Sequence, residues 1–133
     1  MQTAVTAPAA TQDLVLQWRD LVATKVRIYN ALEQTLGKKH DLSCHEFEVL
    51  DQLAEHQVDG KGLRVQELAD VVPITQSALS RLVGRLEEQG LVARALCSLD
   101  RRGIYVELTD GGRARHAEAK PTYCGVLATE FAK

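Results

Sequence analysis

Polar and basic side chains recur at helical spacing between residues 75 and 85, and they are of the types that recognise nucleic-acid bases. On a helix, four apolar residues of this segment would share one face, and the opposite face would present short polar groups. Glutamine can pair with adenine, and arginine binds guanine or a phosphate. The outward residues are Gln76, Ser77, Ser80 and Arg81, with Arg85 beside them. A solvated amphipathic helix has the same periodicity, so a second signal must decide between the two interpretations.

Adjacent arginines, Arg101 and Arg102, lie in the stretch SLDRRG, which separates the alternating runs GLVARAL and IYVELT. This alternation predicts two antiparallel strands, with the arginines at the tip of a hairpin. An arginine there can enter the narrow minor groove of A·T-rich DNA, where the negative potential is enhanced. Alternatively, the two arginines only keep a charged turn soluble. The helix directly before the hairpin favours DNA contact.

The net charge of −2 is unevenly distributed along the 133 residues. Residues 61–116 carry nine Lys/Arg against seven Asp/Glu, whereas the remainder carries seven against eleven. A basic excess in the middle segment suits a polyanionic partner. The length predicts a single domain, and the composition is ordinary for a globular protein, so composition excludes neither an enzyme nor a binding module.

The elements that must position these residues follow from periodicity and capping signals. Residues 1–11 have little to bury and predict a disordered tail, and residues 12–38 predict one long helix that ends near Gly37. Ser43 and Glu46 form a capping box for a second helix that runs to about His56. A short third helix over residues 65–72 would be ended by Pro73.

The second half of the chain predicts a helix, a hairpin and a final helix. Thr75 is expected to cap the helix that carries the polar face, and Gly90 to end it in a left-handed conformation. After the hairpin, Thr109 can cap a last helix over residues 110–133, which Pro121 should bend or restart near Lys120. The fold class is therefore mainly α with a small antiparallel hairpin.

Targeting and cysteine signals are few. No apolar run approaches the roughly 20 residues of a membrane span, and the first residues lack the features of a signal peptide, so a cytoplasmic location is expected. The three cysteines, Cys44, Cys97 and Cys124, have no paired spacing, which predicts reduced thiols. No cofactor and no metal site are expected, because the histidines and cysteines lack the spacing of metal ligands.

The run of residues 62–112 resembles the MarR family of winged-helix transcriptional regulators. The most specific segments are RLEEQGLVAR and SLDRRGIYVELTDGG, which match the family's helix end with Gly-Leu-Val-x-Arg, its D-x-R wing tip and its Leu-Thr-x-x-Gly. The resemblance implies a winged helix-turn-helix lobe over residues 43–109, with residues 12–38 and 110–133 as dimerisation helices. Together these would form one MarR-type domain over residues 12–133.

The resemblance also implies which residues contact DNA. The family's recognition-helix face falls on Thr75, Gln76, Ser77, Ser80 and Arg81, and its minor-groove arginine falls on Arg102. Arg94 and Asp100 match the pair that braces the wing. Family membership further implies a homodimer on a palindromic operator.

A sensing site is a further implication of the resemblance, because members of this family commonly bind small anionic aromatic effectors near the dimerisation helices. The residues placed there are Trp18, Arg27, Tyr29 and His40. Each of them is as readily explained by packing in the dimer core or by solvation. An arginine with aromatic surfaces can hold an aromatic carboxylate.

Two cysteines are candidates for redox sensing. Cys44 would lie in the first turn of the second helix, where the helix dipole lowers a thiol pKa, and Cys97 would lie beside the wing. A thiol without a redox role is the simpler interpretation for both cysteines.

The sequence thus predicts a non-enzymatic, homodimeric, sequence-specific DNA-binding regulator, most readily a repressor relieved by a small effector. The alternatives are a thiol-based regulator of the same family and a winged-helix module that binds protein rather than DNA. A small enzyme using Cys44 and His45 is a further rival, but it has no third orienting group and leaves the helix and hairpin unexplained.

Overall fold

The computed structural model describes residues 9–56, 62–97 and 100–133, and the side chains of residues 10–56, 62–96 and 104–133. The chain forms five helices and a three-stranded antiparallel sheet within these ranges. In chain order the elements are α1 (Ala9–His40), α2 (Cys44–His56), β1 (Leu63–Arg64), α3 (Val65–Val71), α4 (Gln76–Glu88), β2 (Val92–Cys97), β3 (Asp100–Leu108) and α5 (Asp110–Phe131). The predicted fold class is confirmed.

The first helix is longer at both ends than the sequence predicts. It begins at Ala9, inside the predicted tail of residues 1–11, because alanine is the strongest helix former. Residues 1–8 lie outside the described part of the chain. At the other end the helix continues through Gly37, and Asp41 instead adopts the left-handed conformation, with φ of 55°.

The predicted capping residues all have their expected roles. The Ser43 amide donates to the Glu46 carboxylate over 2.7 Å, and the Glu46 amide donates to the Ser43 hydroxyl over 3.0 Å. Thr75 accepts from the amide of Ala78, and Thr109 accepts from the amide of Gly112. Gly90 ends α4 with φ of 77°, and the bonds from Gly90 to Glu87 and from Leu91 to Leu86 complete a Schellman motif.

The sheet has the strand order β1-β3-β2, so the predicted hairpin is joined by a strand that the sequence does not predict. Leu63 pairs with Val106 and Arg64 pairs with Tyr105. A strand of two residues is too short for alternation to appear in the sequence. It closes the free edge of β3 where the hairpin leaves the body of the protein.

The last helix runs through Pro121 as one element, so the predicted restart near Lys120 does not occur. One of its two early glycines has a structural reason, because a Cβ on Gly112 would overlap the carbonyl of Leu91. Close packing of the helix start on the strand before it therefore requires glycine there.

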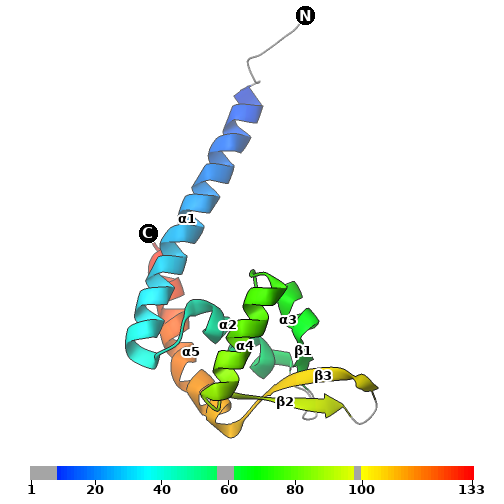
Figure 1. Ribbon diagram of the computed structural model, residues 1–133. Coiled ribbons are helices and arrows are strands. Elements are labelled where there is room, and N and C mark those ends of the chain that lie inside the picture. The colour runs from blue at the N-terminus through cyan, green and yellow to red at the C-terminus, as the bar shows by residue number, and fades with distance from the viewer. Residues whose placement is uncertain (1–8, 57–61, 98–99) are drawn as a thin grey trace, which may run out of the picture.

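The helices α1 and α5 lie side by side, and the N-terminal half of α1 projects away from the rest of the molecule (Figure 1). Residues 10–23 are all exposed along this projection. The core lies lower, where the second half of α1 meets α2, α4, α5 and the base of the hairpin. Its largest fully buried side chains include Phe47, Leu36, Leu42, Leu50, Leu53, Leu68, Leu79 and Leu86.

Candidate nucleic-acid interface

The helix α4 has one buried and one exposed face, as its periodicity predicts. Leu79, Leu82, Val83 and Leu86 are buried in the core. On the other side, Gln76, Ser77, Ser80, Arg81 and Arg85 are exposed. The structure therefore brings the predicted recognition residues onto a free surface that the core holds rigidly from behind.

Thr75 has a structural role at the start of this helix. Its hydroxyl accepts from the amide of Ala78 over 3.2 Å and lies 3.4 Å from the hydroxyl of Ser77. A threonine at the N-cap satisfies one of the backbone donors that the first turn leaves unpaired. The side chain remains exposed, so the same hydroxyl group can also face a ligand.

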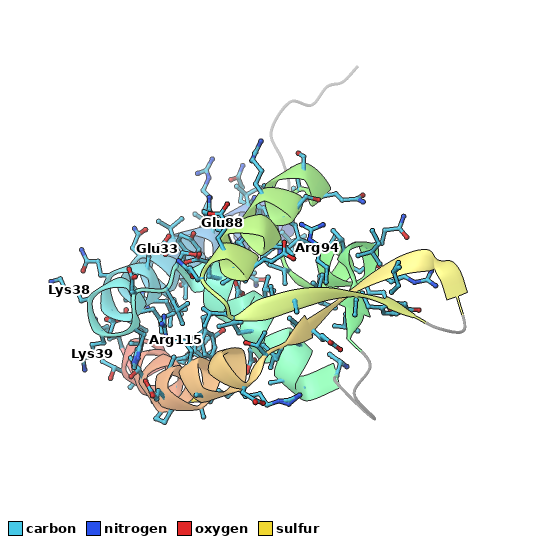
Figure 2. The ribbon with its side chains drawn as sticks, turned by 60° about the horizontal axis from the view of Figure 1, so that its bottom comes forward. Glu33, Lys38, Lys39, Glu88, Arg94 and Arg115 are labelled. Atoms are coloured by element: carbon cyan, nitrogen blue, oxygen red, sulfur yellow. The ribbon has the colours of Figure 1, made fainter. Side chains whose placement is uncertain are left out.

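The hairpin places the tip between β2 and β3, with Cys97 opposite Asp100. The side chains of Asp100, Arg101 and Arg102 lie outside the described residues, as does that of Cys97, so their predicted roles remain predictions. Arg94, the expected partner of Asp100, has its Nε 3.3 Å from the Glu87 carboxylate. This pair joins β2 to the last turn of α4, and Figure 2 shows Arg94 beside that helix.

A residue at the base of the hairpin was missed by the sequence analysis. Arg64 lies over the ring of Tyr105, with 5.2 Å between the guanidinium carbon and the ring centroid, and its Nε donates to the tyrosine hydroxyl over 3.3 Å. Its backbone amide also donates to Glu67 over 2.9 Å at the start of α3. Glu67, three residues after Arg64, is the acidic half of a capping box and could have marked the start of α3. The pattern was not recognised because arginine is not a typical N-cap residue.

A cavity of about 860 Å³ opens between the middle of α1, the start of α2 and the turn before α4. Two of the four predicted effector residues, Trp18 and Tyr29, line it. The polar groups in its wall include Lys25, Asn30, His45 and Glu48, and Pro73 belongs to the turn that leads into α4.

The other two predicted effector residues, Arg27 and His40, do not line this cavity, and their assignment to an effector site stays a prediction. Arg27 donates from Nε to the Glu130 carboxylate over 3.1 Å. His40 lies 2.8 Å from the Thr122 hydroxyl, and Arg115 donates to the His40 carbonyl over 3.0 Å. Figure 2 shows Arg115 near this end of α1. Arg27 and His40 therefore both link α1 to α5, because their positions on α1 face that helix.

The expectation that the helix dipole activates Cys44 is wrong. Its side chain is buried, and burial together with the nearby carboxylates of Glu48 and Glu33 raises the pKa of the thiol to about 12. Glu33 also accepts from the Cys44 amide over 2.8 Å, so α1 supplies a carboxylate at this helix start. His45 directs its Nδ1 to Glu48 over 2.7 Å.

Metal-ligand clusters and membrane-spanning helices are both absent from the described residues. No group of three His, Cys, Asp or Glu side chains in that part of the chain is arranged to hold a metal ion. No helix among the same residues has the length and apolar character that crossing a bilayer requires.

Sequence comparison finds a match to the MarR family model over residues 40–103. An uncharacterized HTH-type transcriptional regulator of Bacillus cereus is 34% identical over 102 residues, which cover 77% of this chain and 65% of that protein. The HTH-type transcriptional regulator PecS of Dickeya dadantii is 28% identical over 116 residues, which cover 77% of this chain and 69% of PecS. This chain thus matches less than two thirds of the length of the Bacillus relative.

Solved structures of other proteins have a similar fold over nearly the whole chain. Sco3205 of Streptomyces coelicolor, a MarR family transcriptional regulator solved in complex with DNA, has a TM-score of 0.80 and 29% identity, and the match covers 97% of this chain and 78% of that one. The transcriptional regulator BldR of Sulfolobus solfataricus has a TM-score of 0.79 and 28% identity, covering 96% of this chain and 87% of BldR. In its helix order, its three-stranded sheet and its hairpin, the chain has the fold of MarR-family winged-helix transcriptional regulators, and it matches the MarR family model over residues 40–103.

Proposed function

We propose that this protein is a sequence-specific regulator of transcription that binds double-stranded DNA through α4 and the wing. The observation that carries the proposal is the division of α4 into a buried apolar face and an exposed face of Gln76, Ser77, Ser80 and Arg81. A helix of this kind fits the major groove, where glutamine and arginine distinguish bases. The similar structure of Sco3205 in complex with DNA supports the same use of the fold here.

The DNA-binding form is proposed to be a homodimer. Leu14, Trp18, Leu21 and Val22 follow one face of α1 and are 61%, 66%, 65% and 40% exposed. Phe131 at the end of α5 is 70% exposed and lines the same cavity as Trp18. A surface of this apolar character is typical of an interface. A second copy related by a two-fold axis would cover it and present two recognition helices to a palindromic site.

Repression relieved by a small effector is the proposed mode of regulation. The cavity beside α1 has aromatic walls from Trp18 and Tyr29, and Lys25 supplies a cation in place of the predicted Arg27. These groups suit an aromatic carboxylate. The similar structure of CouR from Rhodococcus jostii is bound to p-coumaroyl-CoA, which supports a ligand site on this fold. Because Pro73 lines the cavity just before the Thr75 cap, a ligand there would act on the position of α4.

Binding titrations with a duplex that the protein itself selects test the proposal. Arg81→Ala and Arg102→Ala should each weaken binding by about 1–3 kcal/mol and reduce its salt dependence. Lys38→Ala is a matched loss of one positive charge, and Figure 2 shows Lys38 on the side of the molecule opposite the hairpin. That variant should bind as the wild type does. Equal losses in all three variants, or binding without salt dependence, would favour a protein-binding module instead.

A further inference from the structure

A carboxylate from α2 reaches the exposed side of the recognition helix. The Oε2 atom of Glu46 lies 4.0 Å from Nε of Arg85, which joins the first turn of α2 to the last turns of α4. From the sequence pattern, Glu46 is expected only in the capping box and Arg85 only on the DNA surface. The structure places the two residues against each other.

Glu46 is the fixed member of this pair. The residue is only 7% exposed, and its other carboxylate oxygen, Oε1, accepts from the Ser43 amide over 2.7 Å. The Glu46 amide in turn donates to the Ser43 hydroxyl. A nearly buried carboxylate bound at a helix start has little freedom to move, so the position of Oε2 is set by the fold.

Arg85 is the accessible member, because its side chain is 62% exposed. Nε is the guanidinium nitrogen that approaches Glu46, at ion-pair and not hydrogen-bond distance, so the two terminal nitrogens can donate to a second acceptor. Arg85 also follows Arg81 by four residues, so both arginines extend from neighbouring turns on one side of α4.

We propose that Glu46 is a positioning residue for DNA binding, which holds Arg85 so that its terminal nitrogens meet a backbone phosphate. This inference rests on the proposed function of α4. An arginine loses rotamer freedom when it is fixed at a phosphate, and this loss opposes binding. Because the Glu46 carboxylate already restricts the Arg85 side chain in the free protein, Arg85 loses less rotamer freedom when DNA binds.

Two substitutions separate this role from the capping of α2. Glu46→Gln removes the charge that faces Arg85, yet glutamine serves as well as glutamate in a capping box. Glu67→Gln is the matched control, since Glu67 has the corresponding position in α3, where it accepts from the Arg64 amide over 2.9 Å. Both variants remove one negative charge from the same lobe, so the general electrostatic effect on DNA binding is shared.

The experiment measures affinity by fluorescence anisotropy for a duplex selected with the wild-type protein, over a series of salt concentrations. Glu46→Gln should bind roughly two- to fivefold more weakly than Glu67→Gln, as expected for a partly exposed ion pair. In an Arg85→Ala background the two glutamine variants should bind equally. Arg85→Lys keeps the charge but has no Nε group, so it too should be insensitive to Glu46→Gln, and this variant leaves the cap of α2 untouched.

Other results would overturn the inference. Equal affinities of Glu46→Gln and Glu67→Gln in the wild-type background would mean that Glu46 does not position Arg85. Tighter binding by Glu46→Gln would mean that the carboxylate competes with DNA for the arginine. Failure of the wild-type protein to bind any selected duplex would instead reject the proposed function, so the two failures are distinguishable.

Discussion

Arg27 on α1 is fastened to Glu130 at the end of α5 by two hydrogen bonds. Its Nε donates to the Glu130 carboxylate over 3.1 Å, and its Nη2 donates to the Glu130 carbonyl over 3.1 Å. Lys133 donates to the other carboxylate oxygen over 2.8 Å. Hydrogen bonds from Lys133 and then Arg27 hold the pKa of Glu130 below its usual range. The contact holds the end of α5 against α1 and directs the Arg27 guanidinium to α5.

Ligand binding should therefore depend on Lys25 and not on Arg27. Trp18 is the single tryptophan of the chain and lines the cavity, so quenching of its fluorescence reports occupancy directly. With benzoate as the probe, Lys25→Met should weaken binding about five- to tenfold, because the lining cation is lost. Arg27→Met should leave the benzoate affinity unchanged while lowering the melting temperature. The reverse pattern would return Arg27 to the effector site.

Acid should remove a contact between α2 and α5. Lys120 Nζ and His116 Nε2 donate to Asp51 over 2.8 and 2.7 Å. Burial alone would raise the pKa of Asp51, but the hydrogen bonds from Lys120 and His116 outweigh it and lower the pKa below its usual range. A depressed carboxyl pKa stabilises the fold above the unfolded-state pKa of about 3.9, and this stability is lost as pH falls through the folded-state pKa.

The corresponding variant is Asp51→Asn. At pH 7 it should lower the free energy of unfolding by about 1–2 kcal/mol, since charged hydrogen bonds are replaced by neutral ones. The difference should shrink as pH falls below the unfolded-state pKa and disappear below the lower folded-state pKa of Asp51, because the wild-type carboxyl is then protonated as well. Denaturant unfolding at a series of pH values measures this. If the unfolding free energies of the wild type and Asp51→Asn differ by the same amount from pH 7 to pH 2.5, Asp51 acts by packing alone.

Thiol reactivity should separate Cys44 from Cys124. Cys44 is buried with its pKa raised to about 12, whereas Cys124 is exposed. Since the thiolate is the reactive form, iodoacetamide at pH 8 should label Cys124 much faster than Cys44, as followed by mass spectrometry of peptides. Cys44→Ser should leave the response of DNA binding to peroxide unchanged. Rapid labelling of Cys44 in the folded protein would revive the thiol-sensing alternative.

The proposed dimer interface can be tested with two exposed leucines of α1. Leu21 shares a helical face with Leu14 and Trp18, whereas Leu16, which is 58% exposed, points to a different side. Leu21→Ser should raise the dimer dissociation constant about tenfold or more, because roughly 1.5–3 kcal/mol of apolar burial is lost at the interface. Leu16→Ser is the control and should leave it unchanged. Sedimentation equilibrium measures the dimer dissociation constant of both variants. Equal effects of Leu21→Ser and Leu16→Ser would contradict the assignment of the Leu21 face to the dimer interface.

Capping signals made most of the helices around the site predictable. Ser43, Thr75 and Thr109 mark helix starts because their hydroxyls satisfy backbone donors locally, and Gly90 marks a helix end because its left-handed conformation is local too. The polar face of α4 follows from the same short-range periodicity. These features depend on residues within one or two turns of each other, which the sequence displays directly.

Contacts between distant residues were not predictable in this way. From its position on α1, Arg27 could face either an effector site or α5. Its contact with Glu130, more than 100 residues away in the sequence, depends on how α5 packs against α1. The raised pKa of Cys44 likewise depends on packing, since it comes first from burial and then from carboxylates that include Glu33 on another helix. Strand β1 escaped prediction because a two-residue strand is defined by its partner rather than by its own pattern.

Selection of bound duplexes from a random pool tests the central claim most directly. The wild-type protein should enrich an inverted repeat whose half-sites are centred about one helical turn apart, roughly 10 base pairs, because a two-fold dimer presents two α4 helices. Gln76→Ala should change the preferred base at one symmetric pair of positions. Enrichment of no sequence by the wild-type protein, or an identical consensus with Gln76→Ala, would contradict base recognition by this face of α4.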